Sequence, residues 1–464
     1  MTDATMPTSD GAKPARDAVK PLWLKVLGLR LLAPAALVVL SLAMTVAGVF
    51  QLPALAPGEA EFVEATKQMV ETEGYFDPGI QAAMGHNHPP GVHWLQVAAV
   101  RTLANGRDAE VWMYRLPSVA AAVLSVLLVY WLARAFAPPQ AAFLAGILAA
   151  LTLLLAAQAR LATPDTVLLA AILAAQGALA RIWQGEREKR SWAWISIFWL
   201  ALGLGVLAGG LTMPAVILLT IAALCGVRRE VRWLEAVAPL PGLAILLAIV
   251  APMFVGAYLS AGAAAFNDML SAVLRGGAVS TMPPPVNTLA AFAAFWPLPA
   301  FLIFALAGIW RDIRSNEVVF LLCWALPALA LLEFTASGFP HGALPVMPPL
   351  AVLAGVTLAR AQAEPSGRVA GWTAAAVYIL PALALAAVSF VVPVTLGLWP
   401  SPPGAVLAVF GLIGAGAAAR RFAAGNALAA VAPAAVAAVL ITAGTYAFTL
   451  PEVAPAQFGI LFAN

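Results

Sequence analysis

The chain has 464 residues, of which 62% are hydrophobic and 10% are charged, and its mean hydropathy is +0.91. Soluble domains have about 25% charged residues, so this composition excludes a soluble globular protein and predicts an all-α, polytopic membrane protein. The net charge is +3, and most of the Lys and Arg residues fall in short loops. This distribution gives little support to nucleic-acid binding. Cys225 and Cys323 fall inside apolar runs, where a thiol behaves as a small hydrophobe.

Apolar runs of about 20 residues, the length with which a helix crosses a hydrocarbon core of about 30 Å, recur along the sequence. We predict about 13 membrane-spanning helices from these runs and from the charges between them. The predicted spans are residues 31–50, 115–135, 140–158, 166–182, 192–208, 212–226, 234–257, 291–310, 317–334, 344–360, 369–392, 403–419 and 427–449.

Residues 1–30 are polar and basic and lead into the first predicted span. That span is too long for the core of a signal peptide, so we expect residues 1–30 to be a cytoplasmic tail. With this orientation, 19 of the 25 Lys and Arg residues lie on the cytoplasmic side, as the positive-inside rule requires. The sequence therefore predicts a multi-pass protein of the bacterial inner (plasma) membrane with a periplasmic C-terminus.

Two long outer loops, residues 51–114 and 257–288, follow from this topology. In the first loop, Phe62, Ala65 and Met69 alternate with acids at helical spacing, which predicts an amphipathic helix in the membrane interface. Pro89-Pro90 opens a second helical stretch in the same loop. After Arg360 polar residues become rare, so we divide the chain into a transmembrane module at 31–360 and C-terminal transmembrane helices at 361–464.

Ionisable residues at the predicted outer boundary are the candidates for chemistry, because charges at membrane depth are unfavourable unless they are paired or face water. They are Glu59 directly after the first span, Arg160 and Asp165 around the turn RLATPD, Glu333 at the end of the ninth span and His341 before the tenth. Simpler roles stay open: Glu59 and Asp165 suit the first turn of a helix, and Glu333 suits pairing with a nearby base.

Three histidines, His86, His88 and His93, lie in the first outer loop. Their spacing matches no common metal-ligand pattern, so we assign no metal site to them. His88 precedes the rigid Pro89-Pro90 step and is a candidate for a contact to phosphate.

Taken together, the segments GEAEFVEATKQM, HNHPPGVHWLQ, YRLPS, ARLATPD and FPHGALPVMPPLAVL resemble the GT-C membrane glycosyltransferases of family 39, over roughly residues 30 to 360. This family includes protein O-mannosyltransferases and the transferases that add aminoarabinose to lipid A. The resemblance implies transfer of a sugar from a polyprenyl-phosphate carrier to a lipid, glycan or protein acceptor on the outer face, with a divalent metal ion as an optional cofactor.

The resemblance also implies roles for single residues. Glu59 and Asp165 become the candidate catalytic acids, and the candidates for substrate binding are Arg160, His88, Arg115, Glu333, His341 and Arg275. The family's first outer loop opens with an Asp-Glu pair, and here the Asp position reads Gly58. This departure keeps open a second hypothesis, a catalytically inactive relative that binds the lipid carrier or a partner protein. A transporter fits less well, because the interior spans lack paired charges.

Overall fold

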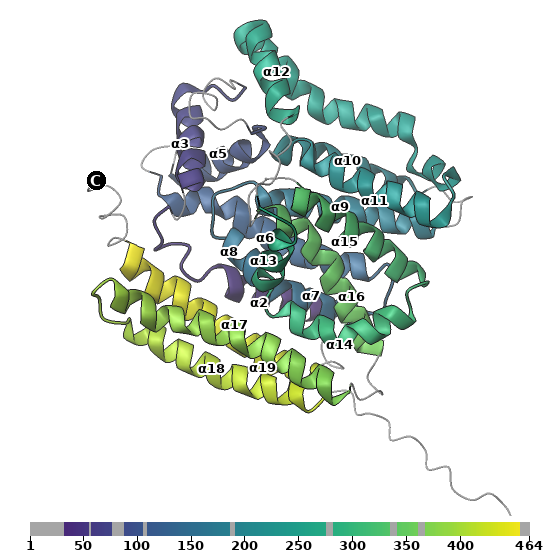
Figure 1. The fold of residues 1–464 in the computed structure, drawn as a ribbon. Helices are drawn as coiled ribbons and strands as arrows, with labels where there is room; N and C mark the ends of the chain where they lie inside the picture. Colours follow the sequence, from purple (N-terminus) through teal and green to yellow (C-terminus); the bar gives the residue numbers. More distant parts are fainter. Residues whose placement is uncertain are drawn as a thin grey trace, which may run out of the picture.

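The computed structural model describes residues 32–54, 57–76, 88–104, 109–185, 191–274, 282–334, 341–360 and 367–454. Within these ranges the regular secondary structure is helical and contains no strand, as the composition predicted (Figure 1). The tail predicted at residues 1–30 and the candidate residue Arg275 lie outside the described residues.

Each of the thirteen predicted spans corresponds to a helix, a bent helix pair or a pair of consecutive helical segments in the described residues. Nine described helices are long and apolar enough to cross a membrane. The first five in chain order are α6 (Val111–Ala133), α9 (Asp165–Gln184), α10 (Trp192–Gly209), α12 (Pro239–Leu274) and α15 (Asn316–Phe334). The others are α17 (Arg368–Thr395), α18 (Pro402–Ala423) and two longer segments, Gly342–Arg360 and Ala427–Ala454. The segment Gly342–Arg360 contains α16 (Met347–Arg360), and the segment Ala427–Ala454 contains α19 (Ala427–Ala443) and the π-helical η3 (Gly444–Thr449).

The remaining predicted spans are shorter or broken. α13 (Val286–Ala294) and α14 (Leu298–Arg311) together pass the length and hydropathy test, but a bend of 107° separates them. The three short apolar helices are α2 (Leu32–Thr45), α7 (Pro139–Ala150) and α11 (Thr212–Arg228). The number of membrane crossings, thirteen, therefore stays a prediction.

Small residues let the central helices approach closely. In α7, ten of the twelve residues are buried, and a Cβ added to Gly355 of α16 would lie 2.5 Å from the backbone nitrogen of Ala145. Such backbone contact is typical of helix packing in membranes, where Gly and Ala replace larger side chains. These helices and their neighbours share one extended hydrophobic core.

The predicted first outer loop contains two helices, α3 (Pro57–Thr72) and α5 (Gly91–Ala104). Phe62, Ala65 and Met69 of α3 are buried, whereas Glu64 is exposed, so the amphipathic helix predicted here is confirmed. In Figure 1 both helices lie above the central helices, close to the far half of α12. Gly262 has a φ of +72° and interrupts α12, which redirects that half across the end of α10.

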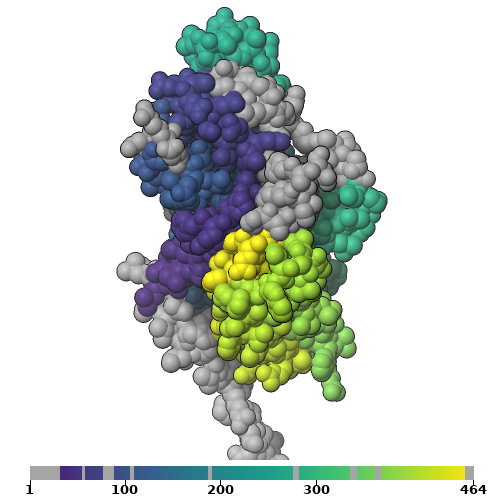
Figure 2. Space-filling view, turned by 90° about the vertical axis from the view of Figure 1, so that its left-hand side faces the viewer, coloured from purple at the N-terminus to yellow at the C-terminus, as the bar shows by residue number. Residues whose placement is uncertain are grey.

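The short connecting helices are α8 (Leu153–Gln158), η1 (Arg232–Val237) and η2 (His341–Val346). The helices α17, α18 and α19 form a separate layer below the central helices (Figure 1). Figure 2 shows this layer, in yellow and light green, directly against the purple N-terminal segment. The hydroxyl oxygen of Thr442 lies 3.7 Å from the sulfur of Met44 across this contact. The boundary predicted at residue 361 stays a prediction.

Candidate active site

A buried ion pair fixes the first outer loop to the central helices. Glu59 lies in the first turn of α3, and Arg115 lies in the first turn and a half of α6. Arg115 donates from Nε to Glu59 Oε1 at 2.7 Å and from Nη2 to Oε2 at 3.1 Å. Both side chains are 0% exposed. A carboxylate and a guanidinium are tolerated at such depth because each satisfies the other in a two-bond geometry.

Arg115 also holds the chain that connects α2 with α3. Its Nη1 donates to the carbonyl oxygens of Val49 at 3.1 Å and Leu52 at 2.7 Å, and its Nη2 donates to Pro53 at 2.6 Å. The family resemblance implies a catalytic role for Glu59 and substrate binding by Arg115. In the structure both side chains are occupied by protein groups, and both roles stay predictions.

The turn between α8 and α9 is held at three points. The backbone N–H of Ala162 donates to Glu59 Oε1 at 3.0 Å, and its carbonyl accepts a hydrogen bond from Gln96 Nε2 at 3.1 Å. One residue further, the Ser118 hydroxyl donates to the Thr163 carbonyl at 3.2 Å. Side chains from α3, α5 and α6 therefore determine the path of this turn, which leads directly to Asp165.

Asp165 is the first residue of α9 and is only partly buried. Its Oδ2 accepts a hydrogen bond from the Thr163 hydroxyl at 2.8 Å. Its position at a helix N-terminus stabilises the ionised carboxylate. Of the two predicted catalytic acids, Asp165 is the one with solvent access.

Arg160 lies at the other end of the same turn and is 0% exposed. Its Nε donates to the Ala47 carbonyl at 2.8 Å and its Nη2 to the Met44 carbonyl at 2.6 Å, while Nη1 contacts the Ala156 carbonyl. Burial lowers the pKa of Arg160 to about 10, so the guanidinium remains charged at neutral pH. The structure directs this charge to the end of α2, and the phosphate contact expected of Arg160 stays a prediction.

A second polar network lies behind Ala162. His93 Nδ1 and Thr66 Oγ1 are 2.7 Å apart, and the Thr66 hydroxyl donates to Gln96 Oε1 at 2.6 Å. Because the hydroxyl has one proton, a neutral His93 with its proton on Nδ1 completes the chain from His93 through Thr66 to Gln96. Phe62 stacks on His93 at 4.0 Å between ring centroids.

The pKa of His93 is lowered to about 3, first by burial and second by the charge of His88. His93 is therefore neutral at physiological pH and acts as a hydrogen-bonding group. The sequence analysis missed Thr66 and Gln96. A signal was available, because Thr66 follows Phe62 by four residues and so lies on the apolar face of the predicted amphipathic helix.

The other predicted site residues are arranged differently. The ring of His88 lies 5.9 Å from that of Phe62 and is partly buried. Glu333 accepts a hydrogen bond from the Thr288 backbone N–H at 2.6 Å, so it caps α13. His341 begins η2, which contacts α8 and α9, and only its backbone is described. Substrate binding by these three residues stays a prediction.

A divalent metal ion needs several oxygen or nitrogen ligands that converge. No three His, Cys, Asp or Glu side chains within the described ranges come close enough to hold one. Glu59, the acid nearest the family's usual acidic pair, already binds Arg115. The residues described do not fit a metal site, and we assign no catalytic step to a metal.

The structural matches define the class: the chain has the fold of the GT-C membrane glycosyltransferases, as the resemblance predicted. Residues 87–255 match the family model described as dolichyl-phosphate-mannose-protein mannosyltransferase. A search of curated proteins found no match.

Solved structures support the same fold. ArnT from Cupriavidus metallidurans in the apo state is 16% identical and gives a TM-score of 0.69, over 93% of this chain and 80% of that one. ArnT bound to undecaprenyl phosphate gives 18% identity and the same TM-score, over 93% and 78% of the two chains. The apo oligosaccharyltransferase of Archaeoglobus fulgidus is 14% identical, with a TM-score of 0.50 over 90% and 56%.

Proposed function

We propose that this chain is a membrane glycosyltransferase that moves a sugar from a polyprenyl-phosphate carrier to an acceptor hydroxyl on the outer face. The observation that carries the proposal is a fold shared over 93% of the chain with ArnT, a protein whose structure has been determined with undecaprenyl phosphate. The acceptor is a lipid, a glycan or a protein, the three classes that the family resemblance implies.

Asp165 is the better candidate for the general base. Glu59 is 0% exposed and bound by Arg115, so a substrate hydroxyl would have to displace a buried ion pair to reach it. Asp165 has solvent access at the start of α9. A carboxylate that accepts the proton of the attacking hydroxyl contributes about 10²- to 10⁴-fold to a rate.

The reaction is a direct displacement. The acceptor oxygen attacks the anomeric carbon of the sugar, and its proton passes to Asp165. The bond between that carbon and the phosphate oxygen breaks, and polyprenyl phosphate leaves with the electron pair. His88 is the described residue that we assign to the developing negative charge, since an imidazole N–H can donate to a phosphate oxygen. Arg275 remains a predicted second donor.

In this account the buried residues position the site. Glu59 and Arg115 hold the turn at Ala162, and Arg160 connects the same turn to the end of α2. Movement of Ala162 would displace Asp165, which lies three residues away. Displacements of about 1 Å can lower a rate by about 10², so these residues matter without contacting substrate.

One observation favours the alternative of a catalytically silent carrier-binding protein. Glu59, Arg115 and Arg160 are 0% exposed and bound to protein groups, and Gly58 stands where the family has Asp. Such a protein would bind the carrier but would not release polyprenyl phosphate from a glycosylated donor.

The two functions are separated by measuring binding and release on the same preparation. The full chain in nanodiscs is incubated with polyprenyl-phosphate sugars and a mixture of acceptors, and free polyprenyl phosphate is quantified by mass spectrometry. Release that depends on acceptor supports transfer. Carrier binding in native mass spectra without any release supports the silent alternative, and the absence of both contradicts each proposal.

A further inference from the structure

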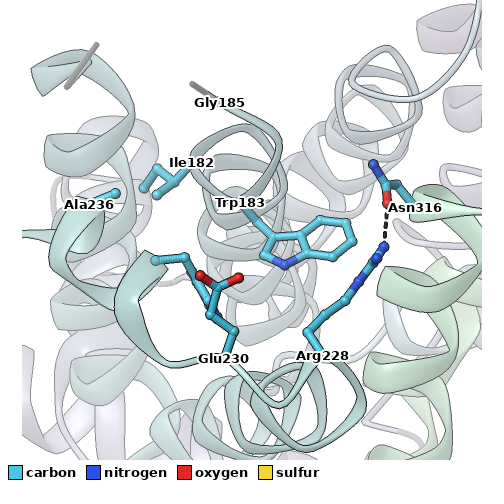
Figure 3. A pocket seen from close by; sticks show the side chains of 8 residues that line it. Ile182, Trp183, Gly185, Arg228, Glu230, Ala236 and Asn316 are labelled. Carbon is cyan, nitrogen blue, oxygen red and sulfur yellow. Dashed lines mark hydrogen bonds between the residues drawn. The ribbon is translucent and has the colours of Figure 1, made fainter. Parts of the chain in front are cut away.

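Arginine side chains contact aromatic rings at both ends of α9. Figure 3 shows a pocket at the end farthest from Asp165, where the guanidinium carbon of Arg228 lies 5.4 Å from the centroid of the Trp183 ring. At the other end, five residues before Asp165, the guanidinium carbon of Arg160 lies 4.1 Å from the centroid of the Tyr446 ring. The second contact brings the last membrane span to the candidate active site.

The contact between Arg160 and Tyr446 stabilises a buried charge. Arg160 is 0% exposed, and among the described residues no carboxylate lies within ion-pair distance of it. The partners of its guanidinium in the described chain are three backbone carbonyl oxygens and the Tyr446 ring. The π face of an aromatic ring attracts a cation, and the attraction increases when the cation is removed from water. The ring therefore contributes to fixing where the guanidinium lies.

Tyr446 lies in an irregular turn of the last span. Residues Gly444–Thr449 form the π-helix η3 within the segment Ala427–Ala454. A π-helical turn is wider than an α-helical turn, is rare, and occurs frequently at functional sites. Polar residues are rare in this part of the sequence, which predicts no site there. The wide turn is nevertheless where the C-terminal layer contributes a side chain to the surroundings of Arg160.

The end of α2 is packed between η3 and Arg160. Gly48 has a φ of +84°, and a Cβ added to it would overlap the backbone carbonyl of Tyr446. The carbonyl oxygens of Met44 and Ala47 accept hydrogen bonds from Arg160 at 2.6 and 2.8 Å. The ring contact, the backbone contact and these two hydrogen bonds connect η3, the end of α2 and the turn before α9.

Arg160 begins the turn that leads to Asp165. Its backbone N–H donates to the Ala157 carbonyl of α8 at 3.1 Å, and two residues later Ala162 is held by hydrogen bonds from and to side chains of the first outer loop. The turn is therefore fixed at its start through the Arg160 side chain and at its middle through Ala162. A change at Tyr446 that lets Arg160 move would displace Asp165.

We propose that Tyr446 is a positioning residue for sugar transfer and acts on Asp165 through its ring contact with Arg160. The inference rests on the proposed function and makes the C-terminal layer part of the catalytic unit. A ring that only fills space would act through its shape. A ring that holds Arg160 acts also through the negative charge of its π face, and this difference can be measured.

Substitutions at position 446 are compared by acceptor-dependent release of polyprenyl phosphate from the full chain in nanodiscs. Tyr446→Phe keeps the ring and should keep most of the turnover. Phenylalanine with two or three ring fluorines, incorporated by amber suppression, keeps nearly the same shape but has less electron density on the ring face, so kcat should fall with each fluorine. Tyr446→Leu should lower kcat at least about tenfold, since displacements of about 1 Å can lower a rate by about 10². The donor KM should stay at the wild-type value.

Trp183→Leu is the matched control, because it removes the arginine contact at the other end of α9. Trp183 follows Asp165 by 18 residues, which places it about 27 Å away at a rise of 1.5 Å per residue. It should lower the unfolding temperature and leave the kcat of the folded molecules unchanged. Phe448→Leu removes an exposed aromatic side chain of η3 and should change neither quantity.

Three outcomes would overturn the inference while the proposed function stands: equal kcat throughout the fluorinated series, an effect on the donor KM instead of kcat, or an equal loss of kcat in Trp183→Leu. Absence of acceptor-dependent release by the wild type would refute the proposed function, and the inference with it. Size-exclusion chromatography confirms that each variant is folded. If Tyr446→Leu fails this check, the fluorinated series decides, because its side chains keep the ring.

Discussion

Glu59 and Arg115 are 56 residues apart in the sequence, yet their side chains form two hydrogen bonds with no exposed surface. Removal of one partner leaves a buried charge uncompensated, which typically destabilises a protein by about 3–5 kcal/mol. We therefore expect Glu59→Gln to lower the thermal unfolding temperature in detergent and also to lower turnover, because Glu59 holds the turn that positions Asp165.

The matched control for this variant is Glu64→Gln, because Glu64 is an exposed acid on the same helix. It should change neither quantity. Loss of turnover at an unchanged unfolding temperature would contradict this positioning role and would favour Glu59 as the catalytic base. Fluorescence-detected unfolding and release of polyprenyl phosphate, measured on the same sample, separate these results.

His93 should make stability depend on pH. Its pKa is about 3 in the folded protein and 6.5 in the unfolded chain, so between these values the unfolded state binds the extra proton. The contribution of His93 to the free energy of unfolding is therefore fully present above pH 6.5. It decreases as the pH falls, by at most about 1.4 kcal/mol per pH unit. We expect the unfolding temperature to fall between pH 7 and pH 5, and to fall less in His93→Gln.

His88→Gln is the comparison variant: it removes only the second cause of the lowered His93 pKa, so it should reduce the pH dependence less than His93→Gln does. Identical pH profiles for the wild type and His93→Gln would contradict the assignment of a neutral, buried His93.

At the residue scale, the sequence indicated which ionisable groups gather but not how they pair. Glu59, Arg115 and Arg160 were all recognised as candidates from their types and positions. Their partners could not be predicted, because Arg115 and Arg160 bind backbone carbonyls at Val49, Leu52, Met44 and Ala47. Every residue has such a carbonyl, so no sequence signal marks the ones that become acceptors.

At the scale of elements, close backbone contacts hold the central helices together. A Cβ at Gly355 of α16 would meet the backbone nitrogen of Ala145 in α7 at 2.5 Å, and a backbone atom cannot turn away as a side chain can. We expect Gly355→Ala to destabilise the protein by about 1–3 kcal/mol, as overpacked cores do. Thermal unfolding in detergent measures the change.

Gly416→Ala in α18 provides the control, since no heavy atom lies within 4 Å of the added Cβ. Alanine is favoured over glycine in a helix interior by about 0.5–1 kcal/mol, so this variant should be neutral or slightly more stable. Equal losses in both variants would contradict the assignment of the Gly355→Ala effect to the contact between α16 and α7.

Element positions were largely predictable because apolar length determines a membrane helix. The breaks within the spans could not be predicted in the same way. The bend of 107° between α13 and α14 occurs within the run predicted as a single span at 291–310, although Pro297 lies at the break. Proline is tolerated in many membrane helices, and four described helices of this chain contain one without such a bend, namely α6, α15, α17 and α19. The sequence alone therefore does not indicate which proline breaks a span.

At the scale of the whole molecule, the distribution of basic residues predicts which end of the bundle faces the cytoplasm. Glu64 on α3 and Arg420 at the end of α18 are both exposed. We expect Glu64→Cys to react with a membrane-impermeant maleimide in cells whose outer membrane has been permeabilised, and Arg420→Cys to react only after the inner membrane is opened. The parent chain, with Cys225 and Cys323, gives the background, and the opposite pattern would contradict the predicted orientation.

We propose that the turn held by Glu59 and Gln96 presents Asp165 to a polyprenyl-phosphate sugar. The most direct measurement compares wild type and Asp165→Asn in nanodiscs, for both donor binding and acceptor-dependent release of polyprenyl phosphate. We expect Asp165→Asn to bind the donor as the wild type does and to release polyprenyl phosphate at least about 100-fold more slowly, because the proton acceptor is gone. Unchanged release by Asp165→Asn would contradict it.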